Sequence, residues 1–327
     1  MRAALVADGG SFDVTMVADP EPGAGELLLR VTACGVCGSD LKAQGAFPVG
    51  TIMGHEFGGE VVGRGPGTEG WHAGMRAAVL PVASCGRCAW CRAGAVIHCP
   101  TAELVGLGGR PGGFADYAVV PASSSFSVPD EVDPRHTALV EPYAVGLHCV
   151  QAGRVAAGDD LLVVGAGTVG LTSIAWARQL GAGRITVVDP VADRRGKAEA
   201  FGATDALADP REAETNEYDV AIECVGRPGL LDACVDAIRP KGRVVVAGTC
   251  VEPDPFWSVA ALMKEAIIAF AVYYAPEEFR TVIRAFTDGT LDPGPLVGRR
   301  MALAEVNEAF AALAASTVDG KILVEPS

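Results

Sequence analysis

The sequence lacks the features expected of a membrane protein or a nucleic-acid-binding protein. Half of its 327 residues are hydrophobic, yet they form no run of about 18 apolar residues, so we expect no transmembrane helix. The opening MRAALVADGG has no apolar core of signal-peptide length. Positive charge is scarce, with 26 Lys and Arg against 40 Asp and Glu, and the net charge of −14 repels nucleic acid and anionic lipid. We therefore expect a cytoplasmic protein whose acidity serves solubility and whose partners include neither nucleic acid nor a membrane.

Cysteine is sparse outside one stretch, SCGRCAWCRAGAVIHCP at residues 84–100, which has the spacing C-x2-C-x2-C-x7-C. In a reducing compartment such a cluster favours a metal over disulfides. Four thiolates complete a tetrahedral zinc site and leave no position for substrate. An iron–sulfur motif would also end in Cys-Pro, but its last gap is shorter, and the net charge argues against a nucleic-acid-binding zinc ribbon. We predict a structural zinc lobe with the ligands Cys85, Cys88, Cys91 and Cys99.

The chain changes character along its length, and its composition predicts an α/β protein. Residues 1–140 are rich in glycine and contain short apolar runs broken by turn signals, which is typical of an irregular β domain. From about Asp159, apolar strands alternate with helices, which indicates a doubly wound parallel sheet covered on both faces. After about Tyr273 two helical segments precede a short final strand, GKILVE.

A dinucleotide-binding motif follows the first of these strands. VVGAGTVG places three glycines in the pattern G-x-G-x-x-G at the start of a helix, and Asp189 ends the next strand. An acid there can bind the ribose 2′-hydroxyl and repels a 2′-phosphate, so NAD is favoured over NADP, although Arg194 and Arg195 lie close by. The predicted cofactor residues are Gly165, Gly167, Thr168, Val169, Gly170, Asp189, Arg194, Val225 and Gly248.

A second, open metal site is suggested by Cys37, His55, Glu56 and Glu141. A cysteine, a histidine and a carboxylate can bind zinc and leave one position for water or an alcohol oxygen. Each residue also has a structural interpretation: a core thiol, a loop histidine or acids near the start of an element. The spacing alone does not choose between these interpretations.

Several motifs in order resemble the zinc-dependent medium-chain dehydrogenase/reductase family of alcohol, polyol and threonine dehydrogenases. They are CGVCGSD, GHEFGGEVVGRG, the four-cysteine lobe, EPYAVGLHCV, GAGTVG with Asp189, and the terminal GKILVE. The resemblance spans essentially the whole chain. It implies a chaperonin-10-like catalytic domain formed by residues 1–143 and 273–327, an inserted NAD-binding Rossmann domain at 144–272, and a catalytic zinc in the cleft between them.

The same resemblance assigns roles to individual residues. Cys37 and His55 match the family's zinc ligands, and Glu141 occupies the third-ligand position of the polyol and threonine branch. Glu56 matches a glutamate that enters the metal's coordination shell in some members, so which of the two acids binds directly stays open.

The resemblance also predicts the groups around the metal. Ser39 matches the hydroxyl that relays the substrate proton, and Asp40 matches an acid that orients a ligating histidine. Lys42 stands where many members carry a relay histidine; its ordinary pKa near 10.4 suits a solvated surface lysine better than a proton shuttle.

Together these features predict a zinc enzyme that transfers a hydride between a secondary alcohol or polyol and NAD. The alternatives are a dehydrogenase of bulky apolar or cyclic alcohols, a zinc-free enoyl or quinone reductase of the same fold, and a non-catalytic regulator that binds NAD and zinc. The apolar stretch EAIIAFAV at 265–272 would be hazardous as an exposed sheet edge, so we expect a homodimer or homotetramer that pairs there.

Overall fold

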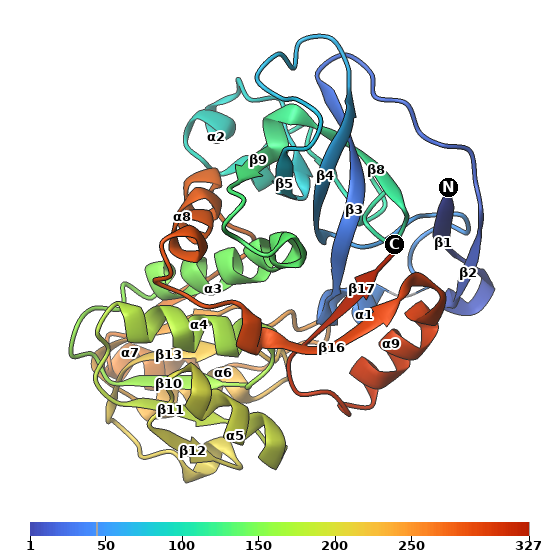
Figure 1. Cartoon of the computed structure of the whole chain (residues 1–327). Coiled ribbons are helices and arrows are strands. Elements are labelled where there is room, and N and C mark those ends of the chain that lie inside the picture. Colours follow the sequence, from blue (N-terminus) through green and yellow to red (C-terminus); the bar gives the residue numbers. More distant parts are fainter. Residues whose placement is uncertain (44, 327) are drawn as a thin grey trace. The chain divides into compact units, whose positions relative to one another are not determined.

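The structure is a computed structural model that describes residues 1–43 and 45–326. It divides into two compact units: unit 1 is Met1–Glu141 with Ala275–Ser327, and unit 2 is Pro142–Tyr274. Within unit 1 the two ends of the chain lie side by side (Figure 1), and the Arg2 guanidinium donates to the Pro326 carbonyl. Unit 1 is therefore closed by segments from opposite ends of the sequence.

Unit 1 is a β unit in which two long strands, β3 and β4, are joined by shorter ones. Its strands are β1 Arg2–Val6, β2 Phe12–Met16, β3 Glu26–Val36, β4 Glu56–Arg64, β5 Arg76–Val79, β6 Val82–Ala83, β7 Glu103–Leu104, β8 Tyr117–Pro121, β9 Ser125–Val128, β16 Val297–Ala302 and β17 Lys321–Glu325. Among the described residues its main sheet has the order β16-β17-β3-β4-β5-β9, and β8 also pairs with β3. Leu27, Leu29 and Val31 alternate along β3 and are fully buried, which places the core on one face of this strand.

The helices of unit 1 are α1 Gly38–Ala43, α2 Ala89–Arg92, α8 Pro276–Thr287 and α9 Val306–Ala314. Helix α8 buries Phe279, Val282, Ile283 and Phe286. These residues follow the spacing i, i+3, i+4, i+7 and therefore lie on one face of the helix, which packs against the core. Helix α9 lies beside β16 and β17 (Figure 1). The irregular β character expected for the first part of the chain is confirmed.

Unit 2 is a parallel sheet covered by helices. Its strands are β10 Leu161–Val164, β11 Ile185–Val188, β12 Asp205–Leu207, β13 Tyr218–Glu223, β14 Ile238–Val246 and β15 Ile267–Phe270. In the described residues their order is β12-β11-β10-β13-β14-β15, and every pair is parallel. The order reverses between β10 and β13, so the carboxyl ends of these strands form the crevice where ligands bind in such sheets.

The helices of this part of the chain are α3 Val140–Ala152, which begins in unit 1, α4 Thr168–Gln179, α5 Ala192–Phe201, α6 Leu230–Ala237 and α7 Ser258–Met263. Helices α4 and α5 cover one face of the sheet and α6 covers the other (Figure 1). All residues of β10, β11 and β13 are buried, as expected for strands covered on both faces. The predicted α/β fold class is confirmed.

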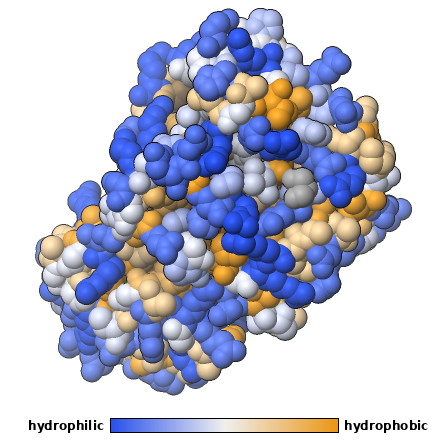
Figure 2. Space-filling view, viewed as in Figure 1, coloured by the Kyte–Doolittle hydropathy of each residue, from blue (hydrophilic) through white to orange (hydrophobic). Residues whose placement is uncertain are grey.

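The surface is predominantly polar on the face drawn in Figure 2, where hydrophobic residues occur in small scattered groups. Elsewhere, β15 and the end of α7 expose large apolar side chains, including Phe270 and Met263. Among the residues described, no helix has both the length and the apolar character needed to cross a membrane.

Candidate functional site

The first candidate metal centre forms where two neighbouring strands of unit 1 meet. Cys37 follows the last residue of β3, and Glu56, directly after His55, is the first residue of β4. These strands are antiparallel, and Gly35 pairs with Glu56, so the end of one strand lies beside the start of the other. As a result, Cys37 Sγ, a His55 ring nitrogen and a Glu56 carboxylate oxygen all lie within 4.8 Å of one another.

One buried carboxylate holds two of these donors. Asp40 is 0 % exposed; its Oδ1 lies 3.1 Å from His55 Nδ1, and its Oδ2 accepts from the main-chain N–H of Cys37 at 2.9 Å. This contact occupies Nδ1 and leaves Nε2 of His55 for a metal. Burial lowers the pKa of His55, but the Asp40 carboxylate outweighs burial and holds that pKa well above its usual value.

Lys321, which lies in the terminal GKILVE, completes this centre, a role that the sequence alone did not indicate. This lysine is 1 % exposed at the start of β17, its Nζ lies 2.7 Å from the Glu56 carboxylate, and it also donates to the Val36 carbonyl. Burial lowers the pKa of Lys321, but the charge of Glu56 opposes it and the pKa rises to about 12. The side chain of Glu56 lies across Gly35, where a Cβ would come within 2.1 Å of Oε2.

These donors fit a zinc ion. The set combines a sulfur, an imidazole and a carboxylate, each of which binds zinc in proteins, and three protein ligands leave a fourth position open. Buried Glu56 Oε2 lies 2.7 Å from the Lys321 ammonium and has no other partner among the described residues, so it keeps a lone pair with which to bind a cation.

A glycine-rich segment that the sequence analysis passed over supports the backbone of His55. A Cβ on Gly106 would lie 2.2 Å from the Gly54 carbonyl oxygen and 2.9 Å from the His55 nitrogen, and a Cβ on Gly112 would lie 2.3 Å from the same carbonyl oxygen. Only glycine permits this close approach of two backbone segments. The glycine-rich run GLGGRPGG at 106–113 is therefore the sequence feature that could have predicted this support.

The remaining predicted residues of this centre lie nearby but outside the group of three. Glu141 is buried in the first turn of α3, and its charge is among those that raise the pKa of Lys321. Ser39 is half-buried in α1, directly before Asp40, and Lys42 is exposed one turn further along the same helix.

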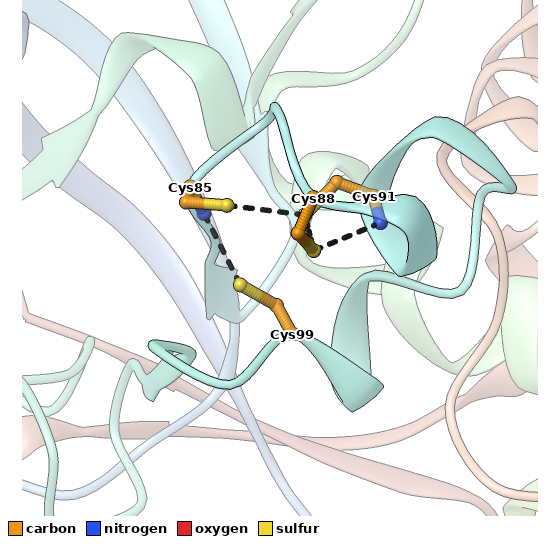
Figure 3. A group of neighbouring side chains, drawn as sticks. All are labelled: Cys85, Cys88, Cys91 and Cys99. Carbon is orange, nitrogen blue, oxygen red and sulfur yellow. Dashed lines mark hydrogen bonds between the residues drawn. The ribbon is translucent and has the colours of Figure 1, made fainter.

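The four cysteines of the lobe form a second group, with their sulfurs turned toward one another (Figure 3). The Cys88 and Cys91 sulfurs are 3.4 Å apart, and those of Cys85 and Cys91 are 3.9 Å apart. Sulfurs bound tetrahedrally to zinc at about 2.3 Å are roughly 3.8 Å apart, so the group fits that ion. The main-chain N–H of Cys85 donates to Cys99 and helps to lower the pKa of that thiol to about 6, which favours the ligating thiolate.

The glycine-rich turn of unit 2 joins β10 to α4. Gly165 has φ +103°, and a Cβ on Gly170 would lie 1.8 Å from the Gly165 carbonyl oxygen, so both positions require glycine. Gly167 faces open space directly before Thr168 and Val169 begin α4. This leaves the helix N-terminus accessible to a phosphate.

Asp189 follows β11 and lies against this turn. It is 4 % exposed; Oδ2 accepts from the Ala166 N–H and Oδ1 from the Val191 N–H, each at 2.9 Å. The Arg195 guanidinium donates to the Asp189 carbonyl at 2.7 Å, and Arg194 is half-buried in α5. Val225 and Gly248 follow β13 and β14, at the same edge of the sheet.

Comparisons with known proteins agree with this arrangement. Residues 23–130 match the family described as Alcohol dehydrogenase GroES-like domain, and residues 168–288 match Zinc-binding dehydrogenase. An L-threonine 3-dehydrogenase of Pectobacterium carotovorum is 30% identical over 93% of each chain, and a sorbitol dehydrogenase of Bacillus subtilis is 27% identical over 95% of this chain and 92% of its own. A solved structure from Sinorhizobium meliloti 1021, assigned as a zinc-binding dehydrogenase and bound to NADP, is 32% identical, covers 99% of each chain and has a TM-score of 0.92.

Proposed function

The chain belongs to the zinc-dependent medium-chain dehydrogenase/reductase family and is an NAD(P)-dependent oxidoreductase of alcohols, and we propose that it oxidises secondary alcohols or polyols with NAD. The observation that carries the proposal is the convergence of Cys37, His55 and Glu56, the first two of which are held by the carboxylate of Asp40. Threonine and sorbitol, the compounds named by the two relatives, both carry secondary hydroxyl groups.

The side chains of unit 1 prepare the substrate oxygen. Zinc held by Cys37, His55 and a carboxylate would act as a Lewis acid toward that oxygen, and the nicotinamide would accept the hydride. Asp40 holds Cys37 and His55 in place, and Ser39, the residue before it, would hydrogen-bond the substrate hydroxyl and pass its proton outward. The exposure of Lys42 suits a surface lysine, so we assign it no relay role.

Of the two acids left open by the sequence, we assign the third ligand to Glu56. Its carboxylate lies within the group of three donors, whereas Glu141 does not join that group in the described part of the chain. The ammonium of Lys321 offsets the negative charge that Glu56 and a Cys37 thiolate bring to a buried site. Glu141, which is buried nearby, would be a second acid able to bind the metal in place of Glu56.

The surroundings of Asp189 support our proposal that NAD is preferred. Both of its carboxylate oxygens accept main-chain hydrogen bonds beside the glycine-rich turn, so the charge is fixed where the adenosine ribose would lie. A 2′-phosphate would face this charge at close range. We expect kcat/KM to be at least tenfold higher with NAD than with NADP.

A panel of secondary alcohols and polyols, assayed with NAD and NADP by absorbance of the reduced nicotinamide, tests the reaction.

We expect the Cys37→Ser variant to lose at least 100-fold in turnover and one of two zinc ions per chain, while still binding NADH. Cys250→Ser, which alters a thiol outside both metal groups, is the matched control and should keep both zinc ions. A Cys37→Ser variant that has lost that zinc yet keeps full turnover would refute the mechanism.

We further propose that two copies of the chain pair through β15. This strand is the last in its sheet, and Ile267, Phe270 and Val272 are 52%, 76% and 54% exposed. An exposed apolar edge strand can hydrogen-bond through its main-chain N–H and C=O groups to a strand of another chain. Phe270→Glu should shift the protein toward monomer in sedimentation velocity, whereas Met16→Glu, at an apolar residue of unit 1 that is 72% exposed, should not. A wild-type protein that sediments as a monomer would exclude this pairing, and the measured mass distinguishes a dimer from a tetramer.

A further inference from the structure

The turn after β13 contains a buried carboxylate that belongs to neither metal centre. Glu223 is the last residue of this strand and is 2 % exposed. Its Oε1 accepts from the main-chain N–H groups of Val225 at 2.7 Å and Gly226 at 2.8 Å. One carboxylate oxygen therefore fixes the turn that carries Val225.

The same residue also holds the turn after β14. The main-chain carbonyl of Glu223 accepts from the N–H groups of Ala247 at 2.8 Å and Gly248 at 2.9 Å. A Cβ on Gly248 would lie 2.4 Å from Glu223 Oε2 and 2.1 Å from the Gly226 nitrogen. The two turns are therefore in direct backbone contact with the carboxylate between them, and neither can shift without the other.

A third turn adjoins this pair. A Cβ on Gly165 would lie 2.7 Å from Val225 Cγ2, so the Val225 side chain packs directly on the glycine-rich turn after β10. Strands β10, β13 and β14 are consecutive in the parallel sheet, which puts all three turns at the edge where a dinucleotide binds.

We propose that Glu223 is a positioning residue for the cofactor, acting through the turns that carry Val225 and Gly248; this rests on the proposed role of those turns in binding NAD. Without an acceptor at this position, two main-chain N–H groups lose their partner, and the turns must rearrange to satisfy them. The cofactor would then meet a displaced surface although no group that touches it has been changed.

The experiment uses the full-length protein and compares three variants. Glu223→Leu and Glu223→Ala remove the acceptor, whereas Glu223→Gln keeps an acceptor oxygen at the same reach. We expect the first two to raise the NADH dissociation constant, measured by fluorescence titration, and the KM for NAD by roughly tenfold, with the KM for the alcohol within about twofold of wild type. Glu223→Gln should stay within about threefold of wild type on all three measures.

Glu278→Leu is the matched control. Glu278 is also a buried glutamate, 7% exposed, whose carboxylate accepts from a main-chain N–H, that of Ala275 at the start of α8 in unit 1. This variant should lower the melting temperature and leave NADH affinity unchanged. Folded Leu or Ala variants that bind NADH as wild type does, or a Gln variant as weak as they are, would overturn the role of Glu223. Wild-type protein that binds no NADH would instead refute the proposed cofactor and this role with it.

Discussion

At the scale of single residues, one carboxylate, that of Asp40, holds two of the three metal-ligand residues of the centre in unit 1. Its two oxygens bind His55 Nδ1 and the Cys37 N–H, so the orientation of both donors follows from the position of a single side chain. The carboxylate is fully buried. Among the described residues, Asp40 is the acid that is hydrogen-bonded to His55. We therefore expect the negative charge of Asp40, and not only the size of its side chain, to support zinc binding and turnover.

Replacing Asp40 by Asn tests this dependence. The amide keeps the size of the side chain but removes the charge that stabilises the imidazole, so zinc affinity or kcat/KM should fall by about 10- to 100-fold. NADH affinity should not change, because Asp40 belongs to unit 1 and the glycine-rich turn to unit 2. Competition with a chelator measures the metal affinity; an Asp40→Asn protein with wild-type affinity and turnover would show that the acid is dispensable.

His136 provides a pH-dependent contribution to stability. Burial lowers its pKa, and Arg300 and Arg135 act in the same direction, against Asp133 and Asp292. The folded pKa lies below the unfolded value near 6.5, so the unfolded chain binds more protons in this range. This stability is present above pH 6.5 and is lost as pH falls through that value toward the folded pKa.

Denaturant unfolding between pH 7.5 and 5.5 measures this contribution. His136→Gln should reduce the slope of the unfolding free energy against pH by an amount that corresponds to less than one proton. A His72→Gln variant, which changes an exposed histidine, serves as the control. An unchanged slope in the His136 variant would contradict the assignment.

The sequence predicted the nearby donors of the metal centre but not its more distant supports. Cys37, His55 and Glu56 lie in recognisable local motifs, whereas Lys321 is 265 residues from Glu56. No spacing rule connects residues so far apart, because their contact exists only once β17 has joined the sheet beside β3. Glu223 was missed for a different reason: an acid at the end of a strand looks like an ordinary polar boundary until its hydrogen bonds to the following turn are visible.

At the scale of elements, the cysteine lobe has little core of its own. Helix α2 contains no buried residue, and Trp90 is 52 % exposed with its ring packed on His98. A segment that buries so little apolar surface depends on other constraints, and a tetrahedral metal site provides them.

Cys88→Ser should therefore release one zinc per chain and loosen residues 84–100 while the sheet of unit 1 remains folded. Limited proteolysis and hydrogen exchange should show faster cleavage and exchange confined to the lobe. Cys250→Ser is again the comparison. A lobe that stays equally protected without its metal would show that packing alone maintains it.

Elements with a strong apolar pattern were predictable, and short polar ones were not. The stretches DDLLVVGAG, GRITVVD and YDVAIECVG became the buried strands β10, β11 and β13. Strand β12 has only three residues, Asp205–Leu207, and β16 contains two consecutive exposed arginines and little apolar signal. Both exist because a neighbouring strand, β11 or β17, offers free hydrogen-bonding groups, which is a property of the sheet and not of the segment.

At the scale of the whole molecule, the chain completes unit 1 only at its end. Strand β17 lies between β16 and β3 in the main sheet, and Ile322, Leu323 and Val324 are fully buried. Every strand of the parallel sheet, in contrast, comes from Pro142–Tyr274. The metal centre and the dinucleotide site therefore depend on different parts of the sequence.

A chain shortened to end at Gly320 tests whether the dinucleotide site forms without a complete metal centre. It lacks β17, whose three apolar residues each contribute about 1.5–3 kcal/mol by burial, against a typical total stability of about 5–15 kcal/mol. It also lacks Lys321, which leaves the buried charge of Glu56 without its partner. We expect this chain to lose the zinc of the Cys37 centre and the cooperative thermal unfolding of unit 1, yet to keep saturable NADH binding. Metal analysis and fluorescence titration of the same preparation decide the matter: joint loss of both ligands would mean that unit 2 cannot fold without a completed unit 1, and retention of that zinc would mean that β17 is not needed to build the centre.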